Sequence, residues 1–197
     1  MKITIGGAVG SGKSTIAKML AEKLGWPYYY MGGLRRKKAR EKGMTLAEYN
    51  RLGETDPSTD REVDEYQKRI GGKNDNFIME GRTSWYFIPD SIKIYIDVDE
   101  KEGARRVWED LQKNPAKRNE DKKIKTIKDA LASHKQRKKS DIKRYKKYYG
   151  INVYDCSHYD FTLDTTGLTK KDAFNKIYEY VRKRLDNIDK NKNLLYP

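Results

Sequence analysis

The sequence predicts an α/β fold in which a parallel sheet of about five strands is covered by helices on both faces. Short β-prone segments alternate with longer helical patterns along the chain, as they do where helices connect parallel strands. A glycine-rich turn lies between the first β-prone segment and the first helical pattern. The 197 residues are enough to bury one such core. The expected strands cover residues 2–6, 27–30, 76–80, 92–97 and 160–164.

The glycine-rich turn indicates a triphosphate site. Residues 7–14 read Gly-Ala-Val-Gly-Ser-Gly-Lys-Ser, directly after an expected strand and before an amphipathic helix. In such a phosphate-binding loop, or P-loop, backbone N–H groups surround the phosphates, the lysine reaches the β- and γ-phosphates, and the Ser14 hydroxyl suits Mg²⁺. We therefore expect the protein to bind ATP with Mg²⁺. The expected ATP-binding residues of the loop are Gly7, Ala8, Val9, Gly10, Ser11, Gly12, Lys13, Ser14 and Thr15.

Two charged helical stretches interrupt the strand–helix alternation. Residues 31–70 contain a helix start at Thr45 and Glu48, and residues 105–148 are strongly basic, with a polar segment at 114–119. We expect both to be insertions at the carboxyl ends of the strands, where open α/β sheets bind ligands. The first would bind the phosphate acceptor and the second would be a mobile lid. The predicted single domain, residues 1–185, thus has a core of 1–30, 71–104 and 149–185.

The end of the chain contains a well-marked helix. Thr169 and Asp172 form a capping-box pattern at its start. An apolar stripe at helical spacing then predicts the face that packs on the sheet. Residues 186–197 are mostly polar, and we expect a flexible tail there. The stripe consists of Phe174, Ile177, Tyr178, Val181 and Leu185.

The composition and charge of the chain indicate which partners and which cellular compartment to expect. The 43 basic and 29 acidic residues give a net charge of +14, which suggests either nucleic acid or a lysine-rich surface that attracts anionic substrates. We favour the second interpretation, because the lysines are spread along the chain without an RNA-binding aromatic motif. Cys156 is the single cysteine, so an intrachain disulfide is excluded. Without a leader or a membrane-spanning run in the sequence, we expect a cytoplasmic monomer.

Arginines at strand ends indicate that the γ-phosphoryl group goes to a second anionic substrate. Arg36 follows the second expected strand, and Glu80 and Arg82 follow the third. Guanidinium groups and Mg²⁺ neutralise the phosphates that such a transfer brings together. In the basic stretch Arg137, Ser140 and Arg144 share one helix face by spacing. By spacing alone, that face could equally be a solvated surface.

The order of these motifs resembles the nucleoside monophosphate kinases, and most of all the short archaeal-like cytidylate kinases. The resemblance covers residues 1 to about 185. It is carried by the phosphate-binding loop, Gly-x-Leu-x-Arg ending at Arg36, and Glu-Gly-Arg ending at Arg82. More specific are the Arg-Tyr-Lys-Lys-Tyr-Tyr-Gly-Ile run that begins at Arg144 and the Tyr-Asp-Phe-Thr-Leu-Asp-Thr-Thr run that begins at Tyr159.

The resemblance implies a role for each matching residue. Arg36 and Arg82 would grip the acceptor phosphate, Arg137 and Arg144 would close over the transferring group, and Arg106 would lie near the donor adenine and phosphates. Ser14 and Glu80 are the candidates for Mg²⁺ and its bound water. The expected catalytic set consists of Lys13, Arg36, Arg82, Arg137 and Arg144, whereas Arg106 belongs to the expected ATP-binding residues. The expected acceptor-binding residues are Gly32, Arg36, Arg82, Asp64 and Asp160.

Two positions depart from the family's pattern. An acidic residue usually follows the glycine at the start of the acceptor helix, where this chain has Gly33. A small hydroxyl residue usually stands at the position of Tyr30. The resemblance therefore leaves the details of acceptor binding at these two positions unspecified.

The expected activity is transfer of the γ-phosphoryl group of ATP to CMP, with dCMP and UMP as further candidate acceptors, giving ADP and CDP. One alternative is an adenylate kinase-like enzyme or another small-molecule kinase with the same phosphate-binding loop. A second alternative, from a different class, is a nucleotide-dependent RNA-binding or assembly factor, which the net charge and Gly33 suggest.

Overall fold

A computed structural model describes residues 1–113 and 124–195 of the chain, and side-chain environments are given up to residue 187. The polar segment predicted at 114–119 lies outside the described residues. Within the described part, the strands form one five-stranded parallel sheet in the order β2-β3-β1-β4-β5. They are β1 (Lys2–Gly7), β2 (Tyr28–Tyr30), β3 (Phe77–Glu80), β4 (Ile92–Asp97) and β5 (Phe161–Asp164). Their bounds agree within one residue with those predicted.

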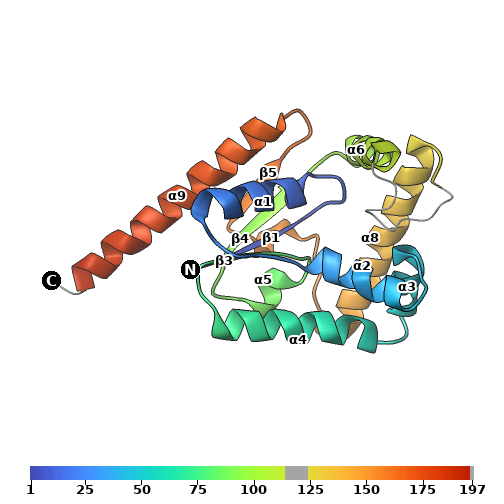
Figure 1. Cartoon of the computed structure of the whole chain (residues 1–197), viewed down its shortest axis with the longest axis horizontal. Coiled ribbons are helices and arrows are strands. Elements are labelled where there is room, and N and C mark those ends of the chain that lie inside the picture. Colours follow the sequence, from blue (N-terminus) through green and yellow to red (C-terminus); the bar gives the residue numbers. More distant parts are fainter. Residues whose placement is uncertain (114–123, 196–197) are drawn as a thin grey trace.

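Helices cover both faces of the sheet, so the three-layer α/β prediction is confirmed (Figure 1). The helices α1 (Lys13–Leu24) and α9 (Lys170–Leu195) pack on one face, over the isoleucines of β1 and β4. On the other face, the Phe77 and Met79 side chains of β3 are covered by α2 (Met31–Glu41) and α4 (Ser58–Lys73). β1 is buried from Ile3 to Gly7, as expected for a strand that is covered on both faces.

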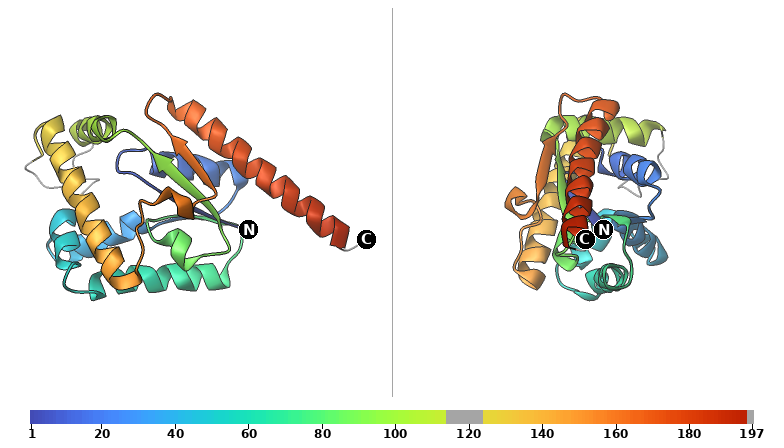
Figure 2. Two further views of the ribbon diagram at one scale, coloured as in Figure 1. Left: turned by 180° about the vertical axis from the view of Figure 1, so that it is seen from behind. Right: turned by 90° about the vertical axis from the view of Figure 1, so that its left-hand side faces the viewer.

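The two charged stretches fold as helices beside the sheet. The acceptor stretch contains α2, α3 (Leu46–Leu52) and α4, and the capping box that was predicted from Thr45 and Glu48 is present at the start of α3. The lid stretch contains α6 (Glu100–Lys113) and α8 (Ile127–Tyr149), which pack on each other. Figure 2 shows α8 running beside α3, so the two insertions meet. Between β3 and β4 lies the short helix α5 (Ser84–Phe87), and the 3-10 turn η1 (Cys156–His158) precedes β5.

The final helix is longer than predicted. Ile177 and Val181 are fully buried against the sheet, with Phe174, Tyr178 and Leu185 packed around them, so the predicted stripe is confirmed. The helix then continues to Leu195 and projects beyond the sheet (Figure 2), so residues 186–195 are helical, where the sequence predicted a tail. A helix that is already nucleated adds one hydrogen bond for each residue, which favours this extension.

None of the helices within the described ranges is both long enough and apolar enough to cross a membrane.

Candidate active site

The phosphate-binding loop connects the carboxyl end of β1 to the start of α1. Gly7 has a φ of +140° and Gly10 a φ of +80°, backbone conformations that L side chains rarely adopt. A Cβ atom at Gly7 would lie 2.1 Å from the Ile96 carbonyl oxygen, and one at Gly10 would lie 2.2 Å from the Gly103 carbonyl oxygen. The loop therefore needs glycine both for its turn and for its close contact with β4 and α6.

The start of α1 presents the groups that bind phosphate in this motif. Gly12 caps the helix without a side-chain hydrogen bond, so the positive end of the helix dipole faces the loop. The Lys13 Nζ atom crosses the loop and donates to the Ala8 carbonyl at 2.6 Å. The loop's conformation and Lys13 together suit a triphosphate.

Ser14 and Glu80 face each other across the sheet edge. The Ser14 hydroxyl donates to Glu80 Oε1 at 2.9 Å, and the Tyr28 hydroxyl donates to Glu80 Oε2. Burial, and then the Glu80 charge, raise the pKa of Tyr28. A hydroxyl beside a carboxylate is the hard-oxygen donor set that Mg²⁺ prefers. No group of three or more histidine, cysteine or acidic side chains suited to a metal occurs in the described ranges.

Arg36 lies at the same edge of the sheet. Its Nη1 atom donates to the Tyr30 hydroxyl at 2.7 Å and to the Gly32 carbonyl at 3.1 Å. Both partners precede Arg36, so the side chain turns back toward the start of α2, which directly follows β2. In the sheet, Tyr30 is level with Glu80. The predicted position of Arg36 at the carboxyl edge is therefore found, and Tyr30 is a contact that sequence reasoning did not name.

Arg82 is held by the lid helix. Its Nε atom lies 2.8 Å from Asp141 Oδ2 and donates to the Tyr154 hydroxyl at 3.1 Å. Tyr154 in turn donates to Asp141 at 2.8 Å. Burial favours the neutral form of Asp141, but the charges of Arg82 and Arg144 outweigh it and lower the pKa of this carboxyl group to about 2. The Asp141 carboxylate is therefore charged and joins Arg82 to α8.

Arg144 is completely buried in an ion-pair network. Its Nη1 atom donates to both carboxylate oxygens of Asp60 at 3.1 Å, and its Nη2 atom donates to Asp141 at 2.6 Å. Asp60 also accepts from Arg35 at 2.6 Å. The order of contacts is thus Arg35–Asp60–Arg144–Asp141–Arg82. In this arrangement Arg144 contacts protein carboxylates, and its predicted contact with the transferring group stays a prediction.

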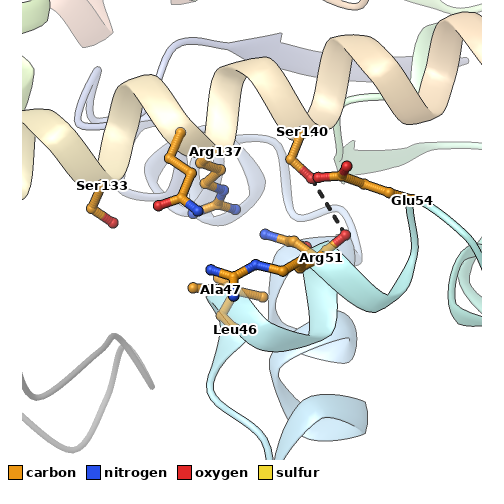
Figure 3. Close-up of a pocket in the computed structure, with 9 residues that line it drawn as sticks. Leu46, Ala47, Arg51, Glu54, Ser133, Arg137 and Ser140 are labelled. Atoms are coloured by element: carbon orange, nitrogen blue, oxygen red, sulfur yellow. Dashed lines mark hydrogen bonds between the residues drawn. The ribbon is translucent and has the colours of Figure 1, made fainter.

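Arg137 and Ser140 face the acceptor insertion from the same side of α8 as Arg144, as their spacing predicted. Figure 3 shows Arg137 beside a small cavity between α3 and α8, with Arg51 extending into it from α3. The Ser140 hydroxyl donates to the Asn50 carbonyl at 3.3 Å. This face of the lid helix therefore packs on the protein, and the alternative of a solvated face does not apply to it.

Arg106 joins the lid to the loop that follows β5. Its Nη2 atom donates to the Thr165 carbonyl at 2.8 Å and to the Thr166 carbonyl at 3.1 Å. The Thr165 hydroxyl lies 3.1 Å from the Ser11 carbonyl oxygen. Arg106 therefore reaches the phosphate-binding loop indirectly, through Thr165. Its contact with ATP stays a prediction.

The two acidic residues that were predicted to contact the acceptor lie in different parts of the structure. Asp160 lies before β5, level with Lys93 near the amino end of β4, and its carboxylate accepts from the Lys93 N–H at 2.8 Å. The ligand edge of a parallel sheet is the opposite, carboxyl edge. The structure therefore places Asp160 at the opposite edge from the phosphate-binding loop, and its role in acceptor binding stays a prediction.

Asp64 is buried between α4 and α8. It accepts from Gln67 at 3.1 Å and from the Tyr149 hydroxyl. Burial is the main reason that its pKa is raised to about 7. Both carboxylate oxygens already have protein partners, and a role in acceptor binding stays a prediction.

Helix spacing could have identified Asp141, which sequence reasoning missed. Asp141 is four residues after Arg137 and three before Arg144, so it shares their face of α8. Tyr28 and Tyr30 share a face of β2 by the alternation of a strand. Tyr154 carried no comparable signal, because it lies in a loop.

Comparisons with known proteins identify the family of this chain. The model of the cytidylate kinase-like family matches residues 2–167. A cytidylate kinase from Methanocella arvoryzae is 35% identical over 181 residues, covering 92% of this chain and 97% of that protein. One from Methanosarcina mazei is 36% identical over 170 residues, covering 84% and 87%.

Among solved structures, a shikimate kinase from Bacteroides thetaiotaomicron has a TM-score of 0.60 at 12% identity and covers 94% of this chain and 98% of its own. At that identity the likeness shows the α/β fold alone. The match to the family model spans the phosphate-binding loop, the strand-end arginines and the lid helix. The expectation of a kinase enzyme of the nucleoside monophosphate class is thereby confirmed, and this chain belongs to the cytidylate kinase-like family.

Proposed function

We propose that the protein transfers the γ-phosphoryl group of ATP to CMP, and also to dCMP or UMP, giving ADP and CDP or the matching diphosphate. The observation that carries the proposal is that Ser14, Glu80 and Arg36 lie at one edge of the sheet, connected through Tyr28 and Tyr30. The first two suit the triphosphate and its Mg²⁺, and the third suits a second phosphate. The relatives named cytidylate kinase support CMP as the acceptor.

The chain's own groups supply positioning and charge neutralisation. The loop N–H groups and Lys13 hold the β- and γ-phosphates, and Arg36 and Arg82 hold the acceptor phosphate. Ser14 and a water bound to Glu80 would hold Mg²⁺, which would supply charge neutralisation at the phosphates. An oxygen of the acceptor phosphate then attacks the γ-phosphorus as the bond to ADP breaks, and no protein nucleophile is required.

The lid has two tasks in this proposal. The lid helices α6 and α8 would cover the cleft and exclude water, so that the acceptor phosphate attacks in place of solvent. Arg137 and Arg144 reach the transferring group when both nucleotides are bound. For that, Arg144 must leave at least part of its contact with Asp60 or Asp141. Residues 31–70 form the acceptor-binding insertion that meets the lid.

An assay of ADP release across CMP, dCMP, UMP, AMP and GMP tests the proposal. We expect the highest kcat/KM with CMP. Preference for AMP would support the adenylate kinase-like alternative, and turnover of none of the five would reject phosphoryl transfer to nucleotides. Calorimetric titration with CMP and with AMP measures acceptor binding independently of turnover.

Two further measurements test the RNA-binding alternative and the oligomeric state. An RNA-binding factor would show negligible turnover, together with an RNA affinity that falls steeply as salt rises. Sedimentation equilibrium measures whether the protein is a monomer, as we propose. The proposed place of action is the cytoplasm, where ATP and nucleoside monophosphates are both available.

A further inference from the structure

The three consecutive tyrosines of β2 have three different environments. Tyr29 points to the core, where its ring makes edge contacts with Tyr66 and Phe77. Tyr28 and Tyr30 point to the opposite face, and their rings stack at 6.3 Å with an interplanar angle of 11°. Tyr28 donates to Glu80 on the metal side of the site. Tyr30 therefore lies between two parts of the site. On one side it stacks on Tyr28, which contacts the proposed Mg²⁺ residue Glu80, and on the other it contacts Arg36, which is proposed to bind the acceptor phosphate.

The Tyr30 ring lies across the start of α2. A Cβ atom at Gly32 would lie 2.7 Å from Tyr30 Cε2, and a Cβ atom at Gly33 would lie 2.6 Å from Tyr30 Cδ1. Real Cβ atoms essentially never come this close to another heavy atom, so both positions must be glycine while the ring stays in place. Tyr30, Gly32 and Gly33 thus form one packed unit.

This unit holds the guanidinium group of Arg36. The Tyr30 hydroxyl accepts from Arg36 Nη1 at 2.7 Å, and the Gly32 carbonyl accepts from the same nitrogen at 3.1 Å. The Arg36 Cζ atom lies 6.0 Å from the centre of the Tyr30 ring. The phenol oxygen accepts this bond through a lone pair, so it keeps its own proton to donate. Arg36 is buried at the sheet edge, where its orientation matters for a bound phosphate.

We propose that Tyr30 is a positioning residue for the acceptor nucleotide. Its hydroxyl fixes the orientation of Arg36 toward the acceptor phosphate, and Gly32 and Gly33 leave the space that its ring needs. This inference rests on the proposed phosphoryl transfer. It adds a residue outside the expected catalytic set, and it explains why tyrosine and glycine occur together at positions 30 and 33.

Tyr30→Phe tests the hydroxyl while keeping the ring. We expect the KM for CMP to rise about tenfold, because a hydrogen bond between a hydroxyl and a charged group is lost, and the KM for ATP to stay within about twofold. The matched control is Tyr29→Phe, which removes a hydroxyl from the next residue of the same strand, on the core side. It should leave both KM values unchanged. A KM for CMP within twofold of the parent value in Tyr30→Phe would overturn the proposal.

Gly33→Ala tests the packing of the ring without removing a polar group. Alanine favours a helix over glycine by about 1 kcal/mol, so helix propensity alone predicts a more stable protein. The new Cβ atom must displace the Tyr30 ring, however, and we expect the KM for CMP to rise. In a Tyr30→Ala background the same substitution should have no further effect on KM. Additive effects in the double variant would contradict the proposed unit.

A measurement without turnover separates this inference from the proposed function. In the parent protein labelled with ¹⁵N-arginine, the Arg36 side-chain protons should exchange slowly with solvent, and Tyr30→Phe should speed that exchange several-fold while Tyr29→Phe does not. If the acceptor assay fails for all five nucleotides, the proposed function fails, and the exchange rates still decide whether Tyr30 holds Arg36. Equal exchange in the parent and in Tyr30→Phe would overturn the inference even if CMP is a good substrate.

Discussion

The Arg144 guanidinium group donates to both carboxylate oxygens of Asp60, 84 residues earlier in the chain, at 3.1 Å. Both side chains are almost completely buried, with side-chain exposures of 0% for Arg144 and 4% for Asp60. Asp60 lies in α4 of the acceptor insertion and Arg144 in α8 of the lid. The contact therefore connects the two parts whose relative movement the proposed reaction requires.

We expect Asp60→Asn to lower the free energy of unfolding by about 3–5 kcal/mol, because two buried arginines lose their shared charged partner. Urea denaturation measures this change. The exposed pair Lys143–Glu54, at 2.7 Å on the same two insertions, is the control, and Lys143→Gln should cost less than about 1 kcal/mol. Equal costs for the two substitutions would show that the buried network does not stabilise the fold.

The pH dependence of stability should report on Asp64. Its pKa is raised from the ordinary 3.8 to about 7, so between these values the folded state binds more protons than the unfolded state. The contribution of Asp64 to stability is therefore fully present below about pH 4 and is lost as the pH rises to 7. We expect Asp64→Asn to gain stability relative to the parent protein across this window. Denaturation curves at pH 4, 5.5 and 7 measure the difference in unfolding free energy between Asp64→Asn and the parent protein. A difference that does not change with pH would contradict the raised pKa of Asp64.

The opposite sign applies to Asp141, whose pKa is lowered to about 2. Its stabilising contribution is present above the ordinary pKa of 3.8 and is lost as the pH falls toward 2. The two carboxyl groups therefore act in separate pH windows, and denaturation curves of the parent protein and of Asp141→Asn between pH 4 and pH 2 measure the contribution of Asp141.

Lys13→Ala should reduce kcat at least about 100-fold, since a cation that contacts the transferring phosphates is removed. The fold should persist, because Lys13 makes its contact to the loop from a partly exposed position. Circular dichroism and thermal unfolding check the fold, and the ADP-release assay checks the rate. An unchanged kcat would remove the phosphate-binding loop from the mechanism.

Glu80→Gln should raise the Mg²⁺ concentration needed for half-maximal activity about tenfold, because a neutral amide holds a metal-bound water more weakly than a carboxylate does. Asp97→Asn is the matched control, since Asp97 ends the neighbouring strand β4 and no hydrogen bond between it and Ser14 is found among the described residues. Activity measured against free Mg²⁺ at constant ATP distinguishes the two. A larger shift in Asp97→Asn would assign the metal to β4.

Local patterns in the sequence were enough to predict the elements of this fold. The strands, the phosphate-binding loop and the capping box at Thr45 depend on residues close together in the chain, and all three are present. Helix spacing likewise placed Arg137, Ser140 and Arg144 on one face of α8. The expected role of Asp160 came from the family resemblance alone, whereas the predicted strand at 160–164 already put this residue at the amino end of the strand.

The sequence by itself thus determined the fold class, the phosphate-binding loop and the position of Arg36 after the carboxyl end of the second strand. Only the tertiary structure decided what each arginine contacts: Tyr30 for Arg36, Asp141 for Arg82, and Asp60 with Asp141 for Arg144. The physical reason is that buried charges must be paired, and two of the partners, Asp141 for Arg82 and Asp60 for Arg144, are distant in sequence and are brought into contact only by packing.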